Sequence, residues 1–311
     1  MGTLAARAEK LLGVPVVATT PVAGGDICVA TRLRLTDGRS ALIKTRPHAP
    51  AGFFETEAAG LRWLADARGA PVPDVLGVDD DCLVLSWIEP GRPTPDAAES
   101  FGRGLSRTHA AGAPTFGAET DGYIGSAPLP NTAAPDWPTF YAEQRVRPYL
   151  RLAHDRGRLA DDDRADVETL LTRLSEVAGP AEDPARVHGD LWSGNVVWGA
   201  APLGYSSAPE HPDGSGASPP VPSGPRAHLV DPAAHGGHRE TDLAMLALFG
   251  VPYLDRILAA YDEATPLADG WAGRVPLHQV HPLLVHAATF GGGYGSRAAA
   301  AARAALHSPA P

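Results

Sequence analysis

The stretch from His188 to Asn195, which reads HGDLWSGN, constrains this chain more than any other feature, together with Asp231 at the end of the next apolar run. An Asp followed by an Asn, with a second Asp beyond a strand, is the residue set that phosphoryl transfer requires. Asp190 can accept a proton from a substrate hydroxyl, whereas Asn195 and Asp231 offer hard oxygen ligands to Mg²⁺. Each piece alone is also a common turn, so only the ordered set indicates this chemistry.

A lysine and a glutamate nearer the N-terminus complete this set. Lys44 is one of only two lysines among 26 basic side chains, and it lies on the third strand-like run, where kinase-like enzymes carry the lysine that holds the α- and β-phosphates. Glu57 shares the apolar face of a helix expected over 53–68, whereas Glu55 points elsewhere. A carboxylate on an apolar face needs a cation, so we expect Lys44 to pair with Glu57; a helix-edge glutamate turned to water is the alternative.

Two further segments are candidates for binding a nucleotide. Gly24 and Gly25 form a turn after the first strand-like run, where backbone N–H groups could approach phosphates, although a hairpin turn alone also explains them. Ser86, Trp87 and Ile88 end the last strand-like run before helical patterns begin, and we expect an adenine to bond to the backbone here.

Charge and composition argue against several other classes of protein. The net charge of −10 disfavours nucleic acid, whose phosphates require a basic surface, and weakly favours a cationic small molecule. The sequence shows no signal-peptide pattern and no apolar run of membrane-spanning length, so we expect no membrane partner and a cytoplasmic location. Cys28 and Cys82 make no disulfide framework, and Cys28 is better explained as a small buried residue than as a redox-sensitive thiol.

Strand patterns fill the first part of the chain and helical patterns the second. Strands are expected at 15–22, 27–35, 39–45, 75–78 and 82–87. Helices are expected at 3–12, 53–68, 95–111, 137–158, 163–178, 240–249 and 298–306, with a loop at 112–135. We therefore predict an α+β, bilobal fold, with a small antiparallel-sheet lobe at 1–88 carrying one important helix, and a larger, mainly helical lobe at 89–311.

The second lobe is interrupted by a segment, 199–226, that is rich in Pro, Gly and Ser. Such a composition cannot bury enough apolar surface to order itself. Strand character resumes at Ala227, so we expect a disordered insertion rather than a linker between domains.

The sequence HGDLWSGN, followed by DPAAHGGHRETDLAMLALFG, resembles the fructosamine kinase (ketosamine 3-kinase) family, over about residues 10 to 305. The resemblance implies a protein-kinase-like fold related to the aminoglycoside phosphotransferases. It also implies transfer of the γ-phosphoryl of ATP, with Mg²⁺, to the 3-hydroxyl of a fructosamine or ribulosamine, a deglycation-type reaction. The dipeptide Trp192-Ser193 separates this family from aminoglycoside and choline kinases.

The resemblance also implies roles for individual residues. Asp190 would act as the base, Lys44 would hold the phosphates, Glu57 would hold Lys44, and Asn195 and Asp231 would hold Mg²⁺.

Other residues would support the catalytic loop or contact the substrate. His188 and Asp242 are the supporting residues, and the candidate substrate residues are Tyr123, Trp137, Trp192 and His235. Trp137 is equally well explained as packing within a helical lobe. His235 and Gly236 stand where the family has two tyrosines.

Two alternatives remain open. A related kinase acting on an aminoglycoside or another amino-alcohol would keep all five chemical groups and change only the pocket. A non-catalytic nucleotide-binding regulator would lack at least one of them, and none is missing. A metal site at His278, His281 and His286 is disfavoured, because their spacing makes no single helical face and Pro282 is expected to interrupt the helix.

Overall fold

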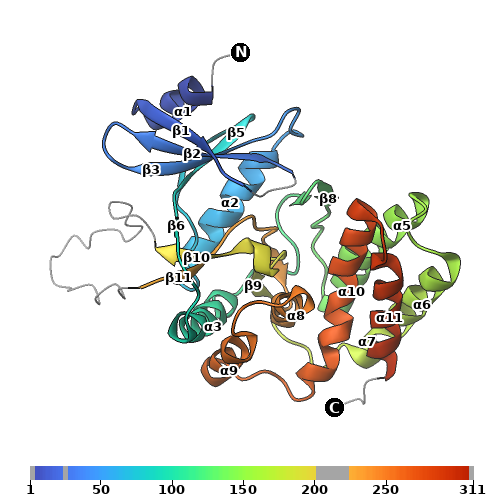
Figure 1. The fold of residues 1–311 in the computed structure, drawn as a ribbon. Coiled ribbons are helices and arrows are strands. Elements are labelled where there is room, and N and C mark those ends of the chain that lie inside the picture. The colour runs from blue at the N-terminus through green and yellow to red at the C-terminus, as the bar shows by residue number, and fades with distance from the viewer. Residues whose placement is uncertain (1–3, 24–26, 201–223, 308–311) are drawn as a thin grey trace.

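The computed structural model describes residues 4–23, 27–200 and 224–307. Gly24 and Gly25, the predicted phosphate-binding turn, and most of the predicted insertion at 199–226 lie outside these ranges. Within them the chain has the predicted α+β, bilobal architecture, with a sheet lobe at the top of Figure 1 and a mainly helical lobe below it.

The sheet lobe is built on one five-stranded antiparallel sheet in the order β1-β2-β3-β5-β4. The strands are β1 (Val16–Pro21), β2 (Val29–Leu35), β3 (Ser40–Thr45), β4 (Val75–Asp79) and β5 (Cys82–Ser86). The central strand β3 pairs Lys44 with Ala30 of β2 on one side and with Leu83 of β5 on the other. Because both edges of this strand are paired, the backbone of Lys44 is held firmly.

One helix covers each face of this sheet (Figure 1). α1 (Leu4–Leu12) packs against a cluster that includes Ile43, and α2 (Phe53–Asp66) packs against a cluster that includes Leu85. Successive side chains of a strand point to opposite faces. Since Ile43 faces α1, its neighbour Lys44 faces α2.

A short strand that the sequence pattern did not predict fastens the junction between the lobes. Strand character was expected to end at Ile88, but β6 (Glu89–Pro90) pairs with the end of β10 (Val196–Ala200), which also pairs with β11 (Arg226–Leu229). The two ends of the predicted disordered insertion, 199–200 and 226, therefore lie in strands. Pairing with β6 supplies hydrogen bonds that local composition does not reveal.

The predicted loop at 112–135 contains a hairpin of β7 (Gly122–Ile124) and β8 (Ala127–Leu129). This hairpin reaches the other lobe, since the Tyr123 hydroxyl donates to Ala51 O at 3.0 Å. A Cβ on Gly122 would lie 3.0 Å from the Thr56 side chain of α2. Strands of three residues are too short to show an alternating pattern, which is why the sequence did not indicate them.

The larger lobe is mainly helical. Its helices are α3 (Pro95–Ala110), α4 (Trp137–Phe140), α5 (Arg147–Asp155), α6 (Asp161–Thr172), α7 (Leu174–Val177), α8 (Arg239–Phe249), α9 (Leu254–Ala264), α10 (Trp271–Phe290) and α11 (Tyr294–His307). Two short strands, β9 (Ala185–Val187) and β12 (His235–Gly237), pair with each other beside the site described below. α10 and α11 pack against α5, α6 and α8 around the larger core (Figure 1).

Three helix predictions are corrected. The helix expected at 137–158 contains a π-helical segment, Tyr141–Val146, between α4 and α5, and the one expected at 163–178 breaks at Arg173. Pro282 does not interrupt its helix but lies inside α10. Burial of α10 among its neighbours compensates for the backbone hydrogen bond that a proline removes.

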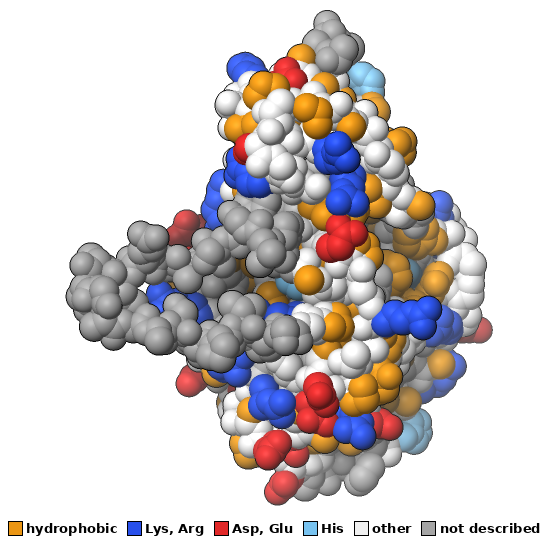
Figure 2. Space-filling view, turned by 60° about the vertical axis from the view of Figure 1, so that its left-hand side comes forward, with side chains coloured by type: hydrophobic (Ala, Val, Ile, Leu, Met, Phe, Trp, Pro, Cys, Tyr) orange, Lys and Arg blue, Asp and Glu red, His pale blue; other side chains and the backbone are white. Residues whose placement is uncertain are grey.

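No helix within the described ranges is long and apolar enough to cross a bilayer. On the face shown in Figure 2, basic side chains lie among acidic and apolar ones.

Candidate active site

The loop that follows β9 is shaped by one glycine and one buried carboxylate. Gly189 has a φ of 82°, and a Cβ at this position would lie 2.2 Å from Ala233 O, so only glycine fits. Asp242, in the first turn of α8, accepts hydrogen bonds from His188 N at 2.7 Å and Gly189 N at 3.0 Å. The loop carrying Asp190 is therefore fixed to α8 through its backbone.

Asp242 is itself held by a buried chain of polar groups. His109 Nε2 lies 3.1 Å from Asp242 Oδ2, and His109 Nδ1 lies 2.8 Å from the Tyr261 hydroxyl. Burial alone would raise the pKa of Asp242, but the bonds from His109 and His188 outweigh burial and lower it. Asp242 thus stays ionised although its side chain has no exposed surface.

His188 orients the loop through both ring nitrogens. Nδ1 accepts from Asp190 N at 3.2 Å, and Nε2 bonds to Val230 O at 2.9 Å, which requires the proton on Nε2. Burial lowers the pKa of His188, consistent with a neutral ring. This ring links Asp190 to the residue immediately before Asp231.

Asp190 and Asn195 lie in direct contact. The Asn195 amide nitrogen donates to Asp190 O at 2.8 Å and to Asp190 Oδ2 at 3.0 Å. Burial raises the pKa of Asp190 to about 7, against the opposing effect of the Asn195 hydrogen bond. A carboxylate with such a pKa can take up a proton near neutral pH, as a general base must.

Lys44 bridges the two lobes. Its Nζ lies 2.6 and 2.8 Å from the two oxygens of Glu57 and 2.8 Å from Asp231 Oδ1. Burial alone would lower the pKa of Lys44, but the two carboxylates outweigh it and raise the pKa, so the ammonium is retained. Glu55, two positions before Glu57, makes no ion pair with Lys44 within the described residues.

Asp231 adopts a backbone conformation that is unusual for any residue except glycine. Its φ is 56°, and its side chain is 49% exposed. Left-handed backbone at a non-glycine residue is costly and often occurs at functional sites.

Two side-chain oxygens near Asp190 are available as ligands for a hard cation such as Mg²⁺. The amide nitrogen of Asn195 makes both bonds to Asp190, so the amide oxygen remains for a ligand. Asp231 Oδ1 accepts from Lys44 Nζ, which leaves Oδ2 available as a ligand. Carboxylate and amide oxygens with open positions are the ligand type that Mg²⁺ prefers beside phosphates.

The segment predicted to bind the adenine has one free backbone donor. Ser86 N donates to Asp74 O at 2.9 Å and Trp87 N donates to Ser40 O at 3.3 Å. Of the three predicted residues, only Ile88 keeps an N–H with no acceptor among the described residues. Trp87 is held from the side, since its Nε1 donates to Glu89 and Arg32 stacks 4.6 Å from its ring centroid.

Trp192 is the predicted substrate residue that the structure leaves accessible. Its side chain is 37% exposed, two residues after Asp190, and its ring lies 6.0 Å from that of Phe249. The ring also covers Gly194, where a Cβ would lie 2.2 Å from it. Gly194, the second glycine of HGDLWSGN, therefore leaves the space that the Trp192 ring occupies.

The other three candidate substrate residues are engaged elsewhere. Tyr123 packs on Phe53 and bonds to the other lobe, as described above. Trp137 is buried and stacks on both Tyr141 and His278 at 4.7 Å, so the packing alternative fits it better. His235 is buried, and its Nδ1 bonds to Ala233 O at 2.8 Å.

His235 and Gly236 stand where the family has two tyrosines, and the backbone explains why glycine is present at position 236. Gly236 and Gly117 exchange two backbone hydrogen bonds of 2.8 Å, and a Cβ on Gly236 would lie 1.9 Å from Thr115 O. A tyrosine at position 236 could not fit this close approach.

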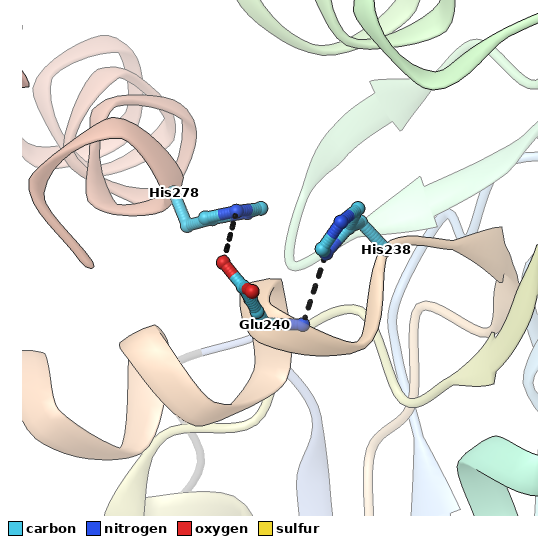
Figure 3. Close-up of side chains that lie close together, drawn as sticks. All are labelled: His238, Glu240 and His278. Carbon is cyan, nitrogen blue, oxygen red and sulfur yellow. Dashed lines mark hydrogen bonds and ion pairs between the residues drawn. The ribbon is translucent and has the colours of Figure 1, made fainter. Parts of the chain in front are cut away.

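A cluster of His238, Glu240 and His278 brings three possible metal ligands within 4.8 Å of one another (Figure 3). Both Glu240 oxygens already accept from Arg274, at 2.6 and 2.9 Å, and His278 Nδ1 lies 2.9 Å from the Thr241 hydroxyl. A metal ion would be repelled by the guanidinium of Arg274. The cluster is better explained as a buried polar network beneath the catalytic loop, which spacing along the sequence did not reveal.

Cys28 lies beside α2 in the sheet lobe. It is half-buried and packs against the cluster beneath α2, and burial raises the pKa of its thiol. A raised pKa disfavours the reactive thiolate.

Comparison with known proteins agrees with this geometry. The fructosamine kinase family model matches residues 3–308. A crystal structure from Thermobifida fusca, named as that of a "putative fructosamine-3-kinase", is 48% identical, with a TM-score of 0.87 over 98% of both chains. A probable ketoamine kinase from Thermus thermophilus is 35% identical over 88% of both chains. A choline kinase from Streptococcus pneumoniae shares the fold alone, at 16% identity and a TM-score of 0.62 over 97% of this chain and 98% of its own. The chain therefore belongs to the fructosamine kinase family and is a phosphotransferase.

Proposed function

We propose that this kinase transfers the γ-phosphoryl of ATP to the 3-hydroxyl of a small ketosamine, a fructosamine or ribulosamine. Family membership supports the ketosamine acceptor, and the observation that carries phosphoryl transfer is the set of contacts around Asp190. This carboxyl accepts a hydrogen bond from Asn195, and Asp231 pairs with Lys44. The backbone N–H of Trp192 donates to Asp190 O, and its accessible ring would offer a surface for the sugar.

Asp190 would position the acceptor and take its proton. Oδ2 accepts from Asn195, which leaves Oδ1 for the substrate hydroxyl. As the hydroxyl oxygen bonds to the γ-phosphorus, its proton moves to Asp190. The bond from that phosphorus to the bridging oxygen breaks, and ADP leaves with the electron pair.

Lys44 would hold the α- and β-phosphates, with Glu57 fixing its position. The ion pair with Asp231 supports this role, because it places the ammonium beside a proposed Mg²⁺ ligand. Asn195 and Asp231 would hold Mg²⁺, which when bound offsets the phosphate charge. The backbone N–H of Ile88 would donate a hydrogen bond to the adenine. Most of the rate enhancement would come from placement and charge stabilisation.

We place the protein in the cytoplasm, with a repair or deglycation role. Both cysteines are free, as expected for a reducing compartment. The partner would be a free ketosamine rather than a glycated residue within a folded protein, because Asp190 lies between two lobes and the acceptor must reach it.

A panel assay tests the substrate class. ADP release would be measured with Mg·ATP and a fructosamine, a ribulosamine, the parent sugars, choline and an aminoglycoside. We expect release with the ketosamines and little with the free sugars. Release with an aminoglycoside or choline, and none with any ketosamine, would assign the protein to the neighbouring activity.

A further inference from the structure

A second cation lies on the same face of β3 as Lys44. Arg46 is two residues further along the chain, just past the end of β3, and side chains two apart on an extended chain share a face. Its guanidinium lies 4.7 Å from the ring centroid of Phe53, the first residue of α2. This contact places the side chain on the α2 side of the sheet, the side that Lys44 faces.

The direction of β3 places Arg46 beyond Lys44 as seen from the junction between the lobes. Ser40, at the start of β3, accepts from Trp87 N at that junction, where the adenine is expected. Arg46 is at the other end. A same-face step along a strand is about 6.7 Å, so Arg46 lies one such step from Lys44, away from the adenine.

The surroundings of Arg46 are those of the nucleotide site. The Cys28 thiol lies within the electrostatic influence of Lys44, Glu57, Asp231 and Arg46 together. The residue after Cys28, Val29, pairs with Thr45, the residue before Arg46. The arginine and the phosphate-binding groups therefore border one space.

Arg46 carries a buried donor that has no acceptor. Its Nη1 is shielded from solvent, yet it makes no hydrogen bond within the part of the chain that the structure describes. Buried donors without partners are rare in folded proteins, and an unpaired guanidinium N–H is more costly than a neutral one. An anionic oxygen from a ligand would satisfy it, and guanidinium groups suit phosphate geometry.

We propose that Arg46 binds the γ-phosphoryl group of ATP, so that it separates ATP from ADP and stabilises the charge that develops during transfer. The proposal rests on the proposed use of ATP at this site. Lys44 would then serve the inner phosphates and Arg46 the terminal one.

Nucleotide titrations by calorimetry test this role without any acceptor substrate. The wild-type protein, Arg46→Met and Arg46→Gln would each be titrated with Mg·ATP, Mg·ADP and AMP. Arg34→Met is the matched control, since Arg34 is exposed on β2 near the opposite end of β3. Losing a charge-assisted hydrogen bond should weaken ATP binding by roughly 10- to 100-fold, while ADP binding changes by less than about 3-fold and AMP binding not at all.

The outcomes separate the two proposals. If the wild-type protein binds no Mg·ATP, the proposed use of ATP fails and the role of Arg46 fails with it. If the wild-type protein binds Mg·ATP, equal losses for ATP and ADP, or no loss for ATP, would overturn the role of Arg46 alone. Thermal unfolding identifies a variant that has lost its fold, and the other Arg46 variant then decides.

Discussion

Asp190 combines two properties that rarely occur together in a carboxyl group near a surface. Its backbone is fixed through His188, and its pKa is raised by burial although Asn195 donates to it. Asp242 and His109, which hold the loop in place, are both buried and do not face solvent. The residue that we propose as the base is thus separate from the residues that set its position.

Replacing Asp190 by Asn keeps the shape of the side chain and removes its capacity to accept a proton. We expect kcat to fall by roughly 10²- to 10⁴-fold, the usual effect of losing a positioned base. The affinity for ATP should change little, because the proposed partner of Oδ1 is the acceptor and not the nucleotide. Steady-state kinetics with a ketosamine checks this, and near-normal turnover would refute the assigned role.

Glu57 and Glu55 lie on one helix and offer a matched pair of variants. Glu57→Gln removes a charge that holds Lys44 at 2.6 Å, so the phosphates should be misplaced and kcat/KM should fall by about 10-fold or more. Glu55→Gln should leave kcat/KM nearly unchanged, since Glu55 makes no ion pair with Lys44. The same kinetic assay compares them, and equal effects of the two changes would argue against the helical-face interpretation.

At the scale of elements, strands from distant parts of the chain converge beside the site. β6 joins the sheet of β10 and β11, and the β7–β8 hairpin contacts α2 of the other lobe through Tyr123 and Phe53. Both features fasten one lobe to the other. Each consists of segments of two or three residues whose pairing depends on tertiary structure.

The connection between β10 and β11 provides a test at this scale. The last pair of their ladder is Gly199 with Arg226, so the chain between them leaves and returns at adjacent points. Replacing residues 202–224 with a short Gly-Ser turn should preserve folding and activity. Loop closure costs only about 0.6 kcal/mol per doubling of length, so the shorter connection should stabilise the protein slightly.

Thermal unfolding and the kinase assay measure these two outcomes separately. A folded deletion variant that has lost phosphoryl transfer would show that the deleted residues contribute to the site.

The sequence predicted the elements that carry regular patterns and missed those that depend on contacts. The step of apolar residues along α2 located Glu57 beside Lys44, because a helical period places residues on one face. Nothing local indicated that Arg274 would pair with Glu240, and the sequence left open whether Trp137 packs or binds substrate, since both depend on how α10 packs on its neighbours. Pro282 misled the helix prediction because burial outweighed a local rule.

At the scale of the whole molecule, several histidines are buried in the neutral form. Burial lowers the pKa of His235 and His238 to about 3 and that of His228 to about 4. In the unfolded chain these groups take up protons near pH 6.5. Below that pH the unfolded state therefore binds more protons than the folded state, and the free energy of unfolding decreases as the pH falls.

Each such group lowers the free energy of unfolding by roughly 1.4 kcal/mol per pH unit between its two pKa values. Urea unfolding should therefore show a clearly lower midpoint at pH 5 than at pH 7. His228→Gln should reduce this difference, whereas His48→Gln, at an exposed position, should not. Equal midpoints at the two pH values would contradict the neutral buried state of these histidines.

The position of the transferred phosphate tests the central claim most directly. The protein would be incubated with Mg·ATP and a free fructosamine, and the product examined by phosphorus NMR with its coupling to the sugar protons. The proposed function predicts one new phosphate ester, on the 3-hydroxyl, and the role proposed for Asp190 predicts that it is absent with Asp190→Asn. An ester at another hydroxyl, or an untouched ketosamine beside a phosphorylated aminoglycoside, would contradict it.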